Sequence, residues 1–172
     1  TEVIGDLKTA NDHFAAWYPG ESPARQPIHT VYGGAHLFKA DGARKLGEVA
    51  FKNLQEYAPD FIAFATALRM PGYEKLPKAA AAKTKLIKAL KSSPVRVHKA
   101  QPEAWLLHTV YERVVEKLKR EAVEDFRIDF EDGYGNRPEE EEDAQALTAA
   151  QEVAKGMREG TLPPFIGIRI KP

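Results

Sequence analysis

Hydrophobic and polar positions alternate most clearly in the last fifty residues of the chain. Residues 123–130 and 165–170 are two short runs with alternating apolar residues, Phe126, Ile128 and Phe130 in the first and Ile166, Ile168 and Ile170 in the second, which predicts two β-strands. Between them, residues 139–158 form a predicted helix that begins with four glutamates, where the helix dipole favours negative charge. A strand, a helix and a second strand at this spacing predict a βαβ unit with parallel strands.

The pattern of the preceding residues is mainly helical, with one more short strand. Residues 28–32 are β-branched or aromatic and predict a strand that ends at Gly33 and Gly34. Residues 61–68 are an apolar segment that periodicity assigns to neither helix nor strand. Helices are expected after the N-cap residue Asp41, over 78–91, and over 102–121 with Leu106, Val110, Val114 and Leu118 as its apolar stripe.

Composition narrows the class of protein. The 172 residues fit a single domain, 1–172, and carry 25 Lys+Arg against 25 Asp+Glu and no Cys. The lack of Cys excludes disulfide frameworks, thiolate zinc sites and cysteine nucleophiles. Because no apolar run approaches the ~20 residues of a membrane helix and no secretory signal is visible, we expect a cytoplasmic protein with no membrane partner.

A basic stretch, residues 75–99, holds seven Lys, one Arg and no acidic residue. The total charge is nevertheless zero, and few aromatic residues accompany the stretch. Base-stacking platforms need such aromatic residues, so we expect no nucleic-acid partner.

Charged side chains gather where the two C-terminal strands end. Alternation places Arg127, Asp129 and Glu131 on one face of their strand, and Arg169 on one face of the next strand. Neighbouring strands lie about 4.8 Å apart, so we expect Asp129 and Glu131 to lie near the Arg169 guanidinium. The carboxyl ends of parallel strands are where βα-loops build active sites.

This cluster admits a functional and a structural interpretation. Asp129, Glu131 and Asp132 are three carboxylates within four residues, which suits a hard cation such as Mg²⁺. An arginine beside them suits a carboxylate or phosphate group of a substrate. Charged residues at such an edge can also simply pair with one another, and the residues alone leave both interpretations open.

The same residues resemble a known enzyme family. RIDFEDGYGN, residues 127–136, resembles the "hydrophobic-D-L-E-D" strand end of the citrate lyase β-subunit and HpcH/HpaI aldolase families, and IGIRIKP, residues 166–172, lies where that family has its next strand. RQPIHTVYGGAHLF, residues 25–38, resembles the first strand of an aldolase-like branch. The DGYGN part is also similar to a stretch of isocitrate lyase and phosphoenolpyruvate mutase. All these enzymes belong to the pyruvate/phosphoenolpyruvate barrel superfamily.

The resemblance implies a fold and an activity. The expected fold is α/β, a partial (β/α)8 TIM-type barrel made of N-terminal strands, with residues 60–122 as a helical insertion. The expected activity is that of a carbon–carbon lyase or aldolase dependent on Mg²⁺, or on Mn²⁺ in its place, acting on a keto acid, hydroxy acid or acyl-CoA through an enolate. Members of such families assemble from several copies, so we also expect a homo-oligomer.

The resemblance further implies roles for individual residues. Arg169 and Asp129 are the expected catalytic residues. Substrate binding is expected from Arg169, Glu131, Asp132 and His29. Glu131 and Asp132 are the expected metal ligands, with the main ligands beyond residue 172. Two alternatives stay open: a phosphoenolpyruvate-handling enzyme of the mutase or isocitrate lyase type, and a non-catalytic fragment or interaction domain that retains the motif for structure.

Overall fold

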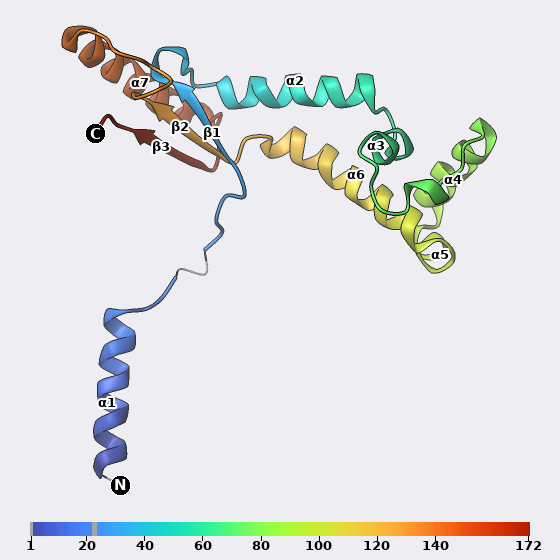
Figure 1. The fold of residues 1–172 in the computed structure, drawn as a ribbon, viewed down its shortest axis with the longest axis horizontal. Helices are drawn as coiled ribbons and strands as arrows, with labels where there is room; N and C mark the ends of the chain where they lie inside the picture. Colours follow the sequence, from blue (N-terminus) through green and yellow to red (C-terminus); the bar gives the residue numbers. More distant parts are fainter. Residues whose placement is uncertain (1, 22–23) are drawn as a thin grey trace.

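Three short parallel strands form an open sheet in the computed structural model, which describes residues 2–21 and 24–172. They are β1 (Thr30–Gly34), β2 (Asp125–Asp129) and β3 (Phe165–Arg169), in the spatial order β1-β2-β3 (Figure 1). Both pairs are parallel and in continuous register. The predicted parallel βαβ unit is therefore confirmed, with α7 (Glu139–Glu159) as its crossover helix.

Helices make up most of the rest of the described chain. The apolar segment 61–68, which periodicity assigned to neither helix nor strand, is mostly helical. Its first turn is capped by the Asp60 carboxylate, which accepts hydrogen bonds from the backbone N–H groups of Ile62 and Ala63 at 2.9 and 2.8 Å. The remaining helices are α1 (Glu2–Trp17), α2 (Gly42–Tyr57), α3 (Phe61–Ala67), α4 (Ala80–Ser92), α5 (Pro94–Ala100) and α6 (Pro102–Glu121), with 3-10 turns η1 (Ala35–Leu37) and η2 (Tyr73–Lys75).

The expected partial (β/α)8 TIM-type barrel is wrong, although the α/β class is right. A barrel needs strands that continue the hydrogen-bonded ladder around a closed ring. Here β1 and β3 are the two edges of an open sheet, and the chain between β1 and β2 forms α2 to α6 instead of a single crossover helix. Charged βα-loops at strand ends occur in open sheets as well as in barrels, so this feature did not distinguish the two folds.

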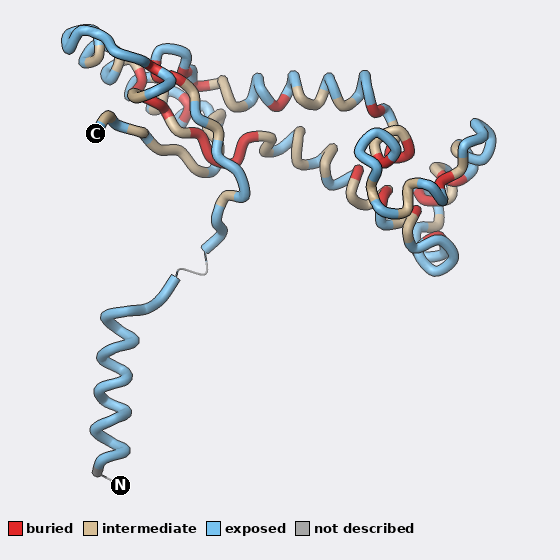
Figure 2. Tube along the Cα trace, viewed as in Figure 1, coloured by how far each residue is buried: buried red, intermediate tan, exposed pale blue. Residues whose placement is uncertain are grey.

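Buried side chains form two separate clusters, visible as two red regions in Figure 2. The helical cluster lies among α3 to α6, where Leu107 is 2% exposed and the Tyr111 hydroxyl donates to the Ala58 carbonyl at 2.9 Å. The sheet cluster joins β2 to α7 through Phe126, Ile128 and Ala149. α2 and α6 pack against each other and connect the two clusters.

Helices cover one face of the sheet, and in the described part of the chain none lies against the other face (Figure 1). Phe126 and Ile128 point to the covered face, while Asp125, Arg127 and Asp129 share the open one. The open face is therefore the polar face of the sheet. On the edge strand β3, Ile168 is the register partner of Ile128 and so lies on the covered face, but it is exposed, which shows that the helical cover is incomplete at this edge.

Glycines extend β1 beyond its expected end. A Cβ on Gly33 would lie 2.5 Å from the Phe126 ring, and one on Gly34 would lie 2.1 Å from the Gly133 carbonyl oxygen. These two residues therefore continue the strand where it packs closely against β2 and the following loop. At the other end, Ile28 and His29 precede the strand.

Candidate functional site

The ends of the three strands meet in one row of residues on the open face. Gly34, Asp129 and Arg169 are register partners on β1, β2 and β3. Asp129 is 2% exposed, and its Oδ2 atom lies 3.5 Å from the Arg169 guanidinium. The structure thus brings together the two residues expected to be catalytic.

Arg169 binds the other two predicted carboxylates as well. It forms ion pairs with Glu131 and, at 2.8 Å, with Asp132. The hydrogen bond to Asp132, together with the charges of Glu131 and Asp129, raises the pKa of the Arg169 guanidinium against the opposing effect of burial. The cation therefore stays fully charged within a cluster of three acidic side chains.

Asp129 shapes the loop that follows β2. Its carboxylate accepts the backbone N–H of Glu131 at 2.8 Å and that of Gly133 at 3.0 Å. Burial alone would raise the pKa of Asp129, but these two N–H groups and the Arg169 charge outweigh it and hold that pKa below its usual value. Asp129 is therefore an ionised anchor for the loop that carries Glu131 and Asp132.

The loop approaches the end of β1 more closely than side chains would allow. The Gly133 carbonyl lies against Gly34, and a Cβ on Gly133 would be 2.9 Å from the Asp129 Oδ2 atom. The two glycines let the backbone of the loop rest directly on the strand end. This contact fixes where the acidic side chains of the loop begin.

His29 lies at the opposite end of β1 from this cluster. It is exposed and precedes Thr30, while the cluster lies at Gly34, about 16 Å further along an extended strand. His36, which follows Gly34 in η1, lies nearer: its ring centroid is 5.7 Å from that of Tyr134 in the acidic loop. His29 and His36 are therefore separated by the length of β1.

The structure adds one residue that the sequence analysis did not select. Tyr32 lies beneath Arg169, with the guanidinium carbon 5.5 Å from its ring centroid. Strand alternation and the parallel register place Tyr32 on the open face, two residues before Gly34. The sequence contains the alternation that places Tyr32 on this face, but its closeness to Arg169 follows only once β1 is known to pair with β2.

The carboxylates do not form a three-ligand metal group in this arrangement. Among residues 2–21 and 24–172, no set of three His, Cys, Asp or Glu side chains converges in a way that could hold a metal ion. Proteins commonly bind Mg²⁺ through only one or two carboxylates, with water and substrate oxygens as the other ligands, and Glu131 and Asp132 would suffice for that. Both are paired with Arg169, so metal binding would require them to turn from the guanidinium.

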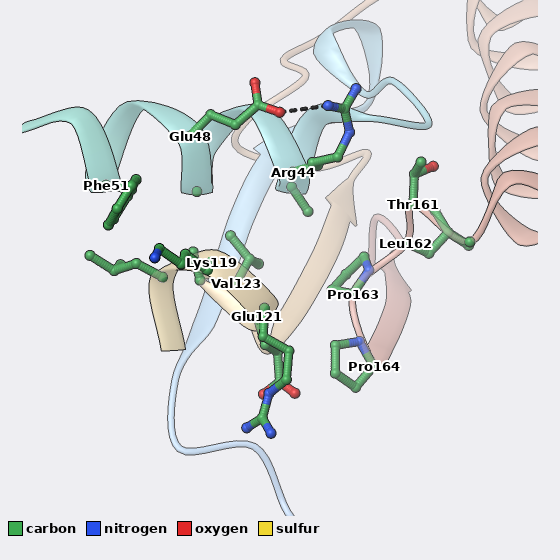
Figure 3. Close-up of a pocket in the computed structure, with 16 residues that line it drawn as sticks. Arg44, Glu48, Phe51, Lys119, Glu121, Val123, Thr161, Leu162, Pro163 and Pro164 are labelled. Carbon is green, nitrogen blue, oxygen red and sulfur yellow. Dashed lines mark hydrogen bonds and ion pairs between the residues drawn. The ribbon is translucent and has the colours of Figure 1, made fainter. Parts of the chain in front are cut away.

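A cavity of about 370 Å³ lies at the other end of the sheet, away from the predicted residues (Figure 3). It is bounded by α2, the end of α6, and the loop that precedes β3. Lys119 lies over the Phe51 ring at 4.9 Å in its wall, and Pro163 and Pro164 form the opposite side. None of the residues expected to bind substrate or metal lines it.

Comparisons with known proteins give a family and no function. No curated protein and no solved structure showed a significant match to the chain. In the described part of the molecule, no helix has the length and apolar character needed to cross a membrane. A family model described as a domain of unknown function, DUF6986, matches residues 7–172, nearly the whole sequence. The chain belongs to the DUF6986 family.

Proposed function

We propose that Arg169, Asp129, Glu131 and Asp132 form the substrate site of a carbon–carbon lyase or aldolase that depends on Mg²⁺ or Mn²⁺. The substrate is a keto acid, a hydroxy acid or an acyl-CoA. One observation supports this proposal above the others: an arginine and three carboxylates meet at the carboxyl ends of parallel strands, on the face that none of the described helices covers. Open α/β sheets bind ligands at such strand ends.

Arg169 is the group that would bind the substrate carboxylate. Its planar guanidinium matches a carboxylate with two parallel hydrogen bonds. Asp132 is the most exposed of its present partners, at 77%, so it is the one that a substrate carboxylate would replace at least cost. Tyr32 supports the guanidinium from below and limits its movement.

Asp129 would act by position and charge. Its ionised carboxylate holds the loop through two backbone N–H groups and also orients Arg169. Glu131 and Asp132, once turned from Arg169, are the residues that would hold the metal ion. The chemistry that Mg²⁺ would supply is Lewis-acid stabilisation of negative charge on the substrate oxygen. His29 takes no part, because it lies at the opposite end of the strand.

Calorimetric titration with pyruvate and with oxaloacetate, in Mg²⁺ and in EDTA, tests the proposal. We expect binding that requires the metal and that is lost in Arg169→Ala. The matched control is Arg44→Ala, which removes an exposed arginine that is also ion-paired to carboxylates but lies on α2. The proposal fails if the unaltered chain binds neither compound in Mg²⁺, or if Arg169→Ala binds as well as Arg44→Ala.

The structure also favours a second candidate, in which the cluster only stabilises the loop. Each of the three carboxylates is already ion-paired with Arg169, which is a sufficient structural reason for the cluster to exist. In that case Arg169→Ala lowers the free energy of unfolding by more than Arg44→Ala does, and the unaltered chain shows no metal-dependent binding of keto acids. Urea unfolding of the two variants, beside the titrations, distinguishes the candidates.

A further inference from the structure

The first helix of the chain exposes an apolar surface that nothing in the described structure covers. α1 stands apart from the sheet and from the other helices (Figure 1), and it is exposed along its length (Figure 2). Its large apolar side chains, and Tyr18 just beyond it, are between 58% and 81% exposed. They are Val3, Ile4, Leu7, Phe14, Trp17 and Tyr18. Apolar surface of this kind marks an interaction site.

The spacing of these residues identifies the kind of partner. Val3, Leu7, Ala10, Phe14 and Trp17 follow one another at intervals of four, three, four and three residues. This is the repeat of a coiled-coil seam, in which each apolar side chain packs into a facing helix. A helix of 16 residues is also only marginally stable by itself in water, so packing against another helix would stabilise it.

We propose that α1 pairs with α1 of a second copy of this chain, in antiparallel orientation, and so forms a homodimer. Asp6 and His13 are seven residues apart and flank Leu7 and Phe14 on the same side of the seam. In an antiparallel pair, equivalent flanking positions face each other, so Asp6 of each copy meets His13 of the other. Two such contacts of acid with imidazole select the antiparallel arrangement, since a parallel pair would place Asp6 opposite Asn11.

Charge also argues against a lipid surface as the partner. Helices that lie on membranes are rich in Lys and Arg on their polar face. α1 has one Lys, Lys8, against three acidic residues. A second copy suits this surface better, because it presents the same apolar seam and places its own His13 and Asp6 opposite Asp6 and His13 of the first copy.

Sedimentation velocity of the full chain over a range of concentrations tests the pairing. We expect a dimer that dissociates on dilution, and loss of that dimer in the double variant Leu7→Glu/Phe14→Glu. The matched control is Thr9→Glu/Ala16→Glu, which adds the same two charges to the outer surface of α1 and should leave the dimer intact. A chain that stays monomeric at every concentration, or a seam variant that dimerises like the control, overturns the proposal.

Trp17 provides a second measurement at the seam. In a Trp105→Phe background, Trp17 is the remaining tryptophan of the chain, and its emission should shift to the blue as the dimer forms. A blue-shifted Trp17 in a chain that remains monomeric would show that α1 packs on its own molecule. Sedimentation of the monomer with anionic vesicles would show a membrane site. Either result overturns the proposal.

Charge exchange tests the orientation. His13→Asp places two carboxylates opposite each other in the antiparallel pair and should weaken the dimer. Adding Asp6→Lys to the same chain restores an opposite-charge contact and should recover it. If His13→Asp leaves the dimer unchanged, or if the double variant stays as weak as the single one, the antiparallel arrangement is wrong.

Discussion

At the scale of single residues, the acidic loop depends on two glycines as much as on its charges. Gly34 and Gly133 let the loop backbone touch the end of β1, and Asp129 then holds the loop through its N–H groups. The carboxylates and Arg169 were visible in the sequence because alternation and parallel pairing place them on one face. The glycine contact was not, because it joins residues about a hundred positions apart.

Gly34→Ala should therefore destabilise the protein. The new Cβ would lie 2.1 Å from the Gly133 carbonyl oxygen, so the loop would have to move. We expect a loss of about 1–3 kcal/mol in the free energy of unfolding, the usual range for overpacking a tight site. Urea unfolding measures this loss. Gly42→Ala is the control, because a Cβ there meets nothing within 4 Å and Gly42 begins a helix. Equal stability of the two variants would contradict the close contact.

A second ionic cluster, at the start of the strands, makes stability depend on pH. Glu121 accepts hydrogen bonds from Arg25 at 2.8 Å and from Lys117 at 2.8 Å. The bonds to Arg25 and Lys117 outweigh the effect of burial and lower the pKa of Glu121 from its usual 4.5 to about 2. Since the folded pKa is below the unfolded one, this carboxylate stabilises the fold above pH 4.5, and that stabilisation is lost as the pH falls towards 2.

We accordingly predict that Glu121→Gln is less stable than the unaltered chain at neutral pH and that the difference shrinks between pH 4.5 and pH 2. Thermal unfolding measured across this range checks it. Glu48→Gln, at an exposed glutamate paired with Arg44, serves as the control and should show a smaller difference at neutral pH. A constant difference between Glu121→Gln and the unaltered chain at all pH values would show that its ionisation is not linked to folding.

At the scale of elements, the sequence predicted where α6 begins and ends better than it predicted which side of α6 is buried. α6 has the predicted bounds, and proline at its first position explains its start. Its buried residues, however, are Ala104, Leu107 and Tyr111, whereas Leu106 of the predicted stripe is exposed. These three residues are spaced at intervals of three and four, so they form a stripe displaced around the helix from the predicted one, and α6 contacts α2, α3 and α5. Which side is buried depends on neighbours that periodicity does not identify.

Two aspartates at helix starts permit a matched test of capping. Asp60 caps α3 through two backbone N–H groups, whereas Asp41 precedes α2 without such a bond and pairs with Lys45 at 2.9 Å. We expect Asp60→Ala to cost about 1 kcal/mol of stability and Asp41→Ala to cost less. Chemical unfolding of both variants gives the comparison. A larger loss for Asp41→Ala would show that its ion pairs matter more than the cap of α3.

At the scale of the whole molecule, the α/β class and the parallel strands followed from the sequence, but the closure of the sheet did not. A strand pattern states which residues alternate and which ends carry charge. It does not state how many strands share one ladder, because that number depends on pairing along the whole chain. Three strands and several helices then leave the open face on which Asp129 and Arg169 lie.

The two buried clusters predict two parts of the molecule that unfold locally and independently of each other. Leu107 belongs to the helical cluster and Ile128 to the sheet cluster, and each is almost fully buried. Truncating either to Ala should cost about 2–5 kcal/mol locally, by removing apolar contacts and leaving a cavity. We expect Leu107→Ala to speed amide hydrogen exchange in α3 to α6 while β1 to β3 stay protected, and Ile128→Ala to do the reverse. Because α2 and α6 join the clusters, faster exchange throughout the molecule in both variants would instead show that these helices couple the clusters into one cooperative unit.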